Sequence, residues 1–182
     1  MRHPLSRVLL AVSGSSAASQ ADALVDGFLH EGIGVTVILT PRAHTFVPEL
    51  AAEVHTDEDW VRAPLHLTLP AQADAFVVAP ATCNTIAKAA CGIADNLALA
   101  SITAWGKEVI FFPGMNRSMW DYAGTKGNVK RLHSLGHFVA QPLDSVAEST
   151  GRVGDAVGWS PEYVVSTTIH RSHLALLGVQ PR

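Results

Sequence analysis

The stretch Glu-Val-Ile-Phe-Phe-Pro-Gly-Met-Asn-Arg-Ser-Met-Trp, residues 108–120, decides the fold that the sequence predicts. Residues 108–112 form a short apolar run typical of a fully buried strand, and Pro113 and Gly114 end it. Open α/β sheets bind their ligands at the carboxyl ends of such strands. Asn116 then offers hydrogen-bond donors and an acceptor among large apolar side chains, which favours a small-molecule site. A strand-to-helix turn with a few core residues is the other interpretation.

The order of strand, small-residue turn and helix recurs along the chain. Strands are expected at 8–12, 35–40, 75–79, 108–112 and 136–139, and helices at 17–30, 86–91, 128–135, 161–177 and after a cap at Asp95 or Asn96. Residues 47–65 are interpreted as a helix or two with loops, and 142–158 as loop-like. This β-α-β repetition predicts an α/β fold with a doubly wound, Rossmann-like or flavodoxin-like parallel sheet in a single domain over 1–182.

Composition excludes several classes of function. A formal charge of −3 excludes a strongly basic nucleic-acid binder, and the absence of a signal peptide and of a long apolar run predicts a cytoplasmic protein without membrane contact. Cys83 and Cys91 do not form a disulfide framework and are expected to be reduced. Only 16% of the residues are charged, against about 25% on average, which favours a homo-oligomer that hides part of its surface. No residue pattern indicates a metal site.

Two strand-end turns are candidate ligand contacts. After the first strand, Gly14, Ser15 and Ser16 precede a helix, so backbone N–H groups and hydroxyls there can hold a phosphate. The turn is neither a G-x-G-x-x-G motif nor a Walker loop, and ordinary helix capping is the alternative. Thr40 and Phe46 follow the second strand and are candidates to contact a ligand, although a strand-end Thr and a core Phe are common.

Three stretches together resemble the flavin-containing cysteine decarboxylase family. Residues 113–120 are similar to its P-x-M-N-x-x-M-W motif, and Pro-Ala-Thr-Cys-Asn-Thr at 80–85 to its P-A-S-A-N-T motif. His66 stands where the family keeps its active-site histidine, and the resemblance covers roughly 7–165. In the second motif Thr82 replaces Ser and keeps the hydroxyl, while Cys stands in place of the second Ala.

The resemblance implies FMN as the cofactor. It implies two catalytic residues: His66 as the base that takes a proton from the cysteine, and Asn116 as a neutral donor to the carboxylate. On the sequence alone, His66 is one of nine histidines and stands between two leucines, and such a histidine is more often a structural residue than a catalytic base. The implied cofactor contacts are Gly14, Ser15, Ser16, Thr40, Phe46, Ala81, Thr82, Ser101, Thr103 and Met115. The implied substrate contacts are Pro80, Asn84, Met119, Gly151 and Arg152.

The family includes phosphopantothenoylcysteine decarboxylases and lantibiotic-type enzymes that oxidatively decarboxylate the carboxy-terminal cysteine of a peptide. Its related prenylated-flavin synthases lack the Met-Asn-x-x-Met-Trp pattern. Phosphopantothenoylcysteine decarboxylases carry, in a flexible substrate clamp, a cysteine that is needed to reduce the intermediate. The matching segment here, about 147–160, contains no cysteine, and its Ser-Thr-Gly-Arg start at 149–152 is similar to that of the peptide-processing enzymes.

The resemblance therefore predicts an FMN-dependent peptidyl-cysteine decarboxylase. Its partners would be a ribosomally made precursor peptide with a carboxy-terminal cysteine and further copies of itself, as a trimer or dodecamer. Its product would be an aminoenethiol for an aminovinyl-cysteine-type natural product, with the flavin reoxidised externally. The alternatives are a phosphopantothenoylcysteine decarboxylase of coenzyme A biosynthesis, a non-catalytic flavin-binding regulatory subunit and a plain nucleotide-binding module.

Overall fold

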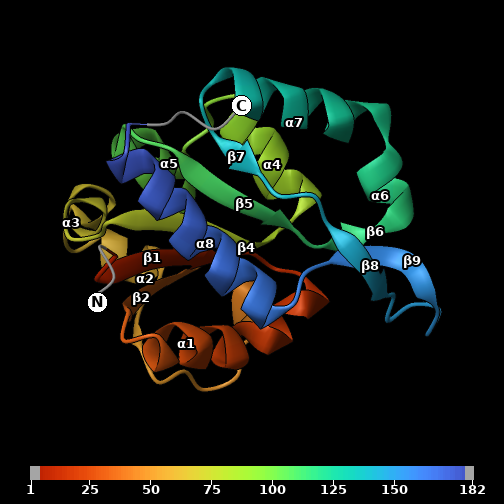
Figure 1. The fold of residues 1–182 in the computed structure, drawn as a ribbon, viewed down its shortest axis with the longest axis horizontal. Helices are drawn as coiled ribbons and strands as arrows, with labels where there is room; N and C mark the ends of the chain where they lie inside the picture. The colour runs from red at the N-terminus through yellow and green to blue at the C-terminus, as the bar shows by residue number, and fades with distance from the viewer. Residues whose placement is uncertain (1–4, 179–182) are drawn as a thin grey trace.

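A six-stranded parallel sheet runs through the middle of the molecule, as Figure 1 shows for the computed structural model, which describes residues 5–178. The spatial order is β3-β2-β1-β4-β5-β7. The strands are β1 (Arg7–Val12), β2 (Gly34–Leu39), β3 (Glu53–His55), β4 (Ala75–Ala81), β5 (Val109–Pro113) and β7 (Phe138–Val139). Every neighbouring pair is parallel, so the predicted α/β fold with a doubly wound sheet is confirmed.

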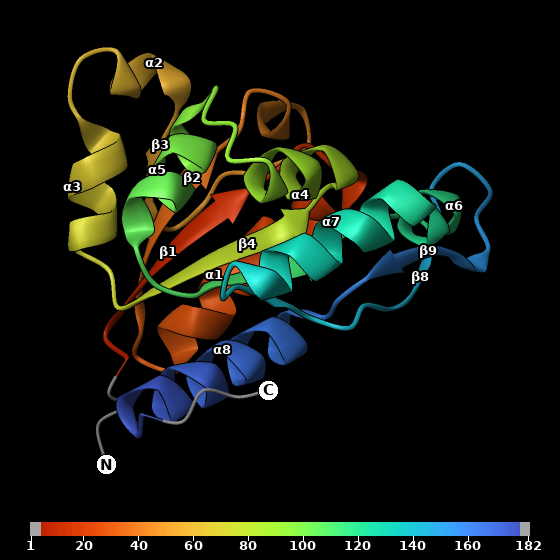
Figure 2. The same ribbon diagram turned by 90° about the horizontal axis from the view of Figure 1, so that it is seen from above.

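Helices cover both faces of this sheet (Figure 2). They are α1 (Ala21–His30), α2 (Asp57–Trp60), α3 (Leu65–Ala71), α4 (Cys83–Ala90), α5 (Leu97–Trp105), α6 (Arg117–Asp121), α7 (Ala123–Ser134) and α8 (Pro161–Leu176), with short 3₁₀ turns at Ser16–Gln20 and Ala43–Thr45. Phe112 packs in the core under α1 and α8, whereas its neighbour Phe111 packs in the core under α4, α5 and α7. Successive strand residues point to opposite faces, so a continuous apolar run is needed to bury both.

Local sequence explains where several helices begin. The Asn96 side chain accepts a hydrogen bond from the backbone N–H of Leu99 at 2.9 Å, so Asn96, one of the two expected caps, begins α5. Ser160 caps α8 in the same way, and Pro161 occupies its first turn, where a missing N–H costs nothing.

A second, small sheet lies at one end of the molecule, where residues 142–158 were predicted to be loop-like. That prediction was wrong, because 143–158 form an antiparallel hairpin. Strands β8 (Leu143–Val146) and β9 (Val153–Gly158) pair with each other, and β9 pairs with β6 (Met115–Asn116). Both hairpin strands are short and partly exposed, so they lack the apolar run that marks a buried strand.

Other boundaries differ from the prediction for local reasons. Helix α4 starts at Cys83 rather than residue 86, since the Thr82 side chain caps it. Helix α7 starts at Ala123 rather than at the expected residue 128. Its first half contains two glycines, which have a low helix propensity, so the sequence does not indicate a helix there. The irregular region 47–65 holds the edge strand β3, which pairs with β2 over three residues only. Within residues 5–178, no helix is both long and apolar enough to cross a bilayer.

Candidate functional site

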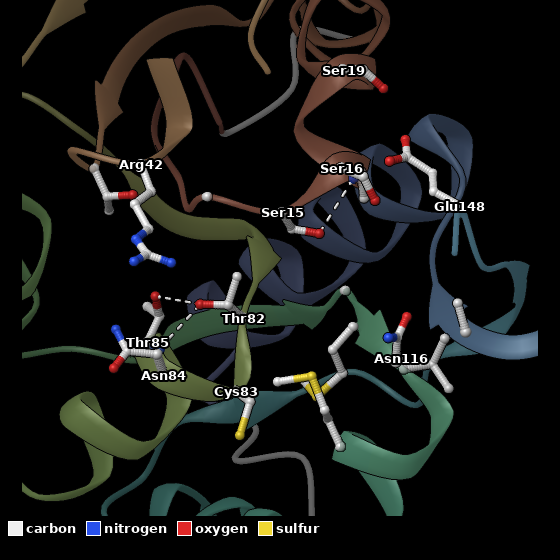
Figure 3. A pocket seen from close by; sticks show the side chains of 18 of the residues that line it. Ser15, Ser16, Ser19, Arg42, Thr82, Cys83, Asn84, Thr85, Asn116 and Glu148 are labelled. Carbon is white, nitrogen blue, oxygen red and sulfur yellow. Dashed lines mark hydrogen bonds between the residues drawn. The ribbon is translucent and has the colours of Figure 1, made fainter. Parts of the chain in front are cut away.

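A cavity of about 800 Å³ opens at the carboxyl edge of the main sheet (Figure 3). The turns after β1, β2 and β4 form one wall, and the segment after β5 together with the β8–β9 hairpin forms the other. Nine of the predicted site residues line it, namely Gly14, Ser15, Ser16, Thr40, Thr82, Asn84, Met115, Asn116 and Met119. The cavity lies where ligands bind in open α/β sheets.

Ser13, which lies in neither family motif, connects two turns of the first wall. Its hydroxyl donates to the carbonyl of Pro80 at 2.6 Å, and the backbone N–H of Thr82 donates back to that hydroxyl at 3.0 Å. Thr82 in turn accepts the N–H of Thr85 at 3.2 Å. The turns after β1 and β4 are therefore held together by two hydrogen bonds, of which the one from Ser13 to Pro80 is buried. The Thr82 hydroxyl caps the first turn of α4.

The serines of the first turn have separate local roles. The Ser15 side chain accepts the N–H of Ala17 at 3.3 Å, which is the capping role considered as the alternative. Its hydroxyl hydrogen has no partner within residues 5–178, so Ser15 can also donate to a ligand. Ser16 lines the cavity beside it, at the start of the 3₁₀ turn.

Gly14 lies against the backbone of Arg42. A Cβ atom built on Gly14 would meet the Cβ of Arg42 at 2.4 Å and its carbonyl carbon at 2.8 Å. No side chain fits between these two turns, so glycine at this position allows them to meet. Arg42 lines the cavity and was missed, because a single charged residue in a loop carries no motif.

The second wall combines one amide with apolar side chains. Asn116 precedes α6 and makes no capping hydrogen bond, so its amide is available to a ligand. Met115 is buried and Met119 half exposed beside it, and Ala156 and Val157 of β9 also line this side. A polar group among adaptable apolar ones suits recognition of a small substrate.

His66 is not part of this cavity in the same chain. It lies in α3, where the indole N–H of Trp60 donates to its Nδ1 at 2.8 Å. This bond leaves the proton of the neutral imidazole on Nε2. The structure therefore does not bring the two predicted catalytic residues, His66 and Asn116, together within one copy.

Seven other predicted contacts also lie outside the cavity lining: Phe46, Pro80, Ala81, Ser101, Thr103, Gly151 and Arg152. The Thr103 hydroxyl donates to the carbonyl of Ala100 at 2.7 Å, within its own helix. Ser101 is fully buried and its hydroxyl has no partner in residues 5–178. Gly151 and Arg152 lie in the exposed turn of the hairpin, and the roles assigned to all seven stay predictions.

Within residues 5–178, no group of three or more His, Cys, Asp or Glu side chains is arranged to hold a metal ion. Hydroxyls, amides and the charged side chains of Arg42, Lys88, Asp95 and Glu148 line the cavity. A parallel sheet whose strand-end turns present such groups defines an α/β protein that binds a nucleotide-type cofactor.

This chain belongs to the Flavoprotein family, whose model matches residues 2–173. It is 38% identical over 143 residues to phosphopantothenoylcysteine decarboxylase of Mus musculus, covering 72% of this chain and 70% of that protein.

Among solved structures, it is similar to a cysteine-to-serine variant of PPC decarboxylase complexed with pantothenoylaminoethenethiol. The TM-score is 0.83 at 32% identity, over 89% of this chain and 95% of that one. It is also similar to the FMN-dependent cysteine decarboxylase TvaF of thioviridamide biosynthesis, with a TM-score of 0.70 at 33% identity, over 75% and 90% of the two chains. The predicted family and its flavin cofactor are confirmed, and the named activities of these relatives are decarboxylations.

Proposed function

We propose that this chain is an FMN-dependent decarboxylase that acts on the carboxy-terminal cysteine of a peptide and releases an enethiol. The observation that carries the proposal is the chemistry of the β8–β9 hairpin. Its residues at the cavity are Ser145, Val146, Ala147, Glu148, Ala156 and Val157, and residues 143–158 contain no cysteine. Because a thiol at this position is what the reductive branch uses to reduce its intermediate, the product here leaves unreduced.

The residues of the first wall fit the cofactor. The close contact between Gly14 and Arg42 brings the turns after β1 and β2 together, and Ser15, Thr40 and Thr82 line the cavity with their hydroxyls. When bound, FMN supplies the two-electron oxidation of the cysteine that makes loss of carbon dioxide possible. The protein's part is to hold that group beside the substrate.

Asn116 and the two methionines serve the substrate in this proposal. The amide of Asn116 donates to the cysteine carboxylate without a fixed positive charge, and a cation there would stabilise the carboxylate against its loss. Met115 and Met119 place apolar surface beside it. A partly desolvated carboxylate loses carbon dioxide more readily, because the product is neutral.

His66 completes the site from a second copy of the chain in this proposal. The cavity of the same chain does not include His66, and two apolar residues close to it in the sequence, Val61 and Leu67, are 88% and 55% exposed. Exposed apolar side chains near a proposed catalytic residue that lies outside the cavity favour a subunit interface at this surface, in line with the expected trimer or dodecamer.

The experiment is incubation of the purified protein with a synthetic peptide that ends in cysteine, followed by mass spectrometry. We expect a product lighter by one carbon dioxide and two hydrogens. The same peptide ending in serine should remain unchanged, and Asn116→Ala should abolish the mass change while FMN stays bound. A product lighter by carbon dioxide alone would mean that the enethiol is reduced, which would contradict this branch.

The second candidate is a phosphopantothenoylcysteine decarboxylase. The 38% identity to the Mus musculus enzyme and the TM-score of 0.83 to a PPC decarboxylase favour it. Cys83 is the thiol that lines the cavity, and its Sγ lies 3.3 Å from the Thr125 hydroxyl, on α4 rather than on the hairpin. Turnover of phosphopantothenoylcysteine, with no turnover of any peptide ending in cysteine, would decide for this candidate.

A further inference from the structure

We propose that Arg42 binds the phosphate group of FMN, an inference that rests on FMN being the cofactor of the proposed function. The charges that line the cavity lead to it. Lys88 and Asp95 form an ion pair, with Nζ to Oδ2 at 2.5 Å, and so neutralise one another. Glu148 is an anion on the hairpin side. Arg42 has no ion pair or side-chain hydrogen bond within residues 5–178, which leaves it as the unpaired cation of the lining.

The position of Arg42 is fixed by its backbone. The N–H of Thr40 donates to the carbonyl of Val12 at 3.1 Å, and the N–H of Ala43 donates to the carbonyl of Thr40 at 2.8 Å. These bonds fold the turn after β2 onto β1, and the contact of Arg42 with Gly14 closes it from the other side. The side chain therefore starts from a rigid point at the edge of the cavity.

Figure 3 shows the guanidinium of Arg42 pointing into the cavity, toward Thr85 and Asn84 at the start of α4. Thr82 and Ser15 lie close by, so the surrounding side chains are neutral hydrogen-bonding groups. Neutral groups can accept and donate hydrogen bonds but carry no charge to offset that of a phosphate monoester. A guanidinium offsets part of that charge, and its planar geometry allows two parallel hydrogen bonds to the phosphate oxygens.

The two ends of the cavity differ in a way that orients the cofactor. Arg42 and Asn116 lie on opposite sides of it (Figure 3). The Asn116 side carries Met115 and Met119, which suit an uncharged ring and the reacting substrate. The phosphate of FMN therefore goes to the Arg42 side, and the flavin ring lies toward Asn116.

The test compares FMN with riboflavin, which has the same ring and no phosphate, on the flavin-free full-length protein. Binding is followed by quenching of flavin fluorescence, so no turnover is needed. We expect Arg42→Ala to weaken FMN binding by about 10- to 100-fold, the range for losing a hydrogen-bonded charge. Riboflavin affinity should change by less than about twofold, because riboflavin lacks the group that Arg42 binds. Arg42→Lys should retain part of the FMN preference, and Lys130→Ala, an exposed cation on α7 outside the cavity, should retain all of it.

Equal losses of affinity for FMN and riboflavin would mean that Arg42 contacts the flavin ring or only stabilises the fold, and would overturn the assignment. Unchanged binding of both would overturn it too. Each of these results leaves the decarboxylase proposal standing. Failure of the parent protein to bind FMN would end both.

Discussion

The two walls of the cavity are built differently. The wall with the turns after β1 and β4 rests on β4, which is buried along its whole length, on the buried residues 8–12 of β1, and on the buried hydrogen bond from Ser13 to Pro80. The hairpin wall is thin, with Leu143 47% and Val153 73% exposed. A wall fixed by the core suits a cofactor that every member of a family binds, whereas a thin, partly exposed wall can change without loss of the fold. Both walls carry family motifs, residues 80–85 in the first and 113–120 in the second, whereas the hairpin part of the second wall carries the difference on which the proposed substrate class rests.

The largest expected effect tests whether the residues of these two walls are sufficient for catalysis. His66 lies in neither wall. If it is the base of the reaction, His66→Asn should lower the decarboxylation rate by about 10²- to 10⁴-fold and leave FMN bound. The measurement is the rate of peptide mass change together with bound flavin absorbance. His133→Asn, an exposed histidine on α7, is the matched control.

A mixing experiment then asks which copy supplies His66. Oligomers assembled from His66→Asn and Asn116→Ala chains should recover activity, since some sites would contain an intact His66 from one copy and an intact Asn116 from another. No recovery in oligomers shown to contain both chains would place the two residues in one copy and contradict the shared site.

The next effect concerns the first wall, which the turns after β1, β2 and β4 form. Gly14→Ala should weaken FMN binding about 10- to 100-fold, because a methyl group at 2.4 Å from the Cβ of Arg42 forces the two turns apart. Retained flavin after gel filtration and a binding titration measure it. Gly127→Ala in α7, where a Cβ meets nothing within 4 Å, should bind FMN normally. Normal binding by the Gly14 variant would mean that this wall yields as easily as the hairpin.

A smaller effect is expected for the hairpin wall. Arg117 donates from Nε to the carbonyl of Gly154 at 3.1 Å and pairs with Asp144, so it holds both hairpin strands against α6. Arg117→Ala should raise the peptide KM by about three- to tenfold and speed proteolysis within 143–158, with FMN affinity unchanged. Asp121→Ala, which breaks a nearby pair with Lys126 but leaves the hairpin untouched, is the control. A parallel loss of FMN would show that the walls are not independent.

The smallest effect is on stability at the edge of the main sheet. Burial lowers the pKa of His137 below 6.5 despite the opposing charge of Glu108, and its Nδ1 accepts the N–H of Val109 at 3.2 Å. As the pH falls below about 6.5, the unfolded chain binds a proton at this residue before the folded chain does, so the free energy of unfolding decreases. Denaturant unfolding at pH 7 and about pH 5 should show a smaller decrease for His137→Gln than for the parent. His133→Gln, on the surface, should behave like the parent.

The sequence predicted the strands and turns of the first wall well and the hairpin poorly, because only buried strands leave a clear apolar pattern. Strands such as 75–81 are buried on both faces and leave a continuous apolar run, so both their existence and the turn that follows can be read locally. The hairpin strands pair through backbone hydrogen bonds with one another and with β6, about 40 residues away, and their side chains carry little pattern.

The site residues follow a similar division. Thr82, Asn84 and Asn116 lie in motifs and do line the cavity. Arg42 is placed there only by the fold, through its contact with Gly14, and no local pattern reveals such a contact. His66 matches the position of a motif residue, yet within one chain it lies outside the cavity and is hydrogen-bonded to Trp60, so its part in the reaction stays a proposal.

The separation of β6 from its partner also sets an order of events during synthesis. Strands β1, β2 and β4 and their turns are complete by residue 82, whereas β9 ends at Gly158. A chain leaving the ribosome therefore exposes the turns after β1, β2 and β4 a stretch of 76 residues, from 82 to 158, before the hairpin can close on β6. The cofactor wall can form first in the nascent chain, and the hairpin is added to a surface that already exists.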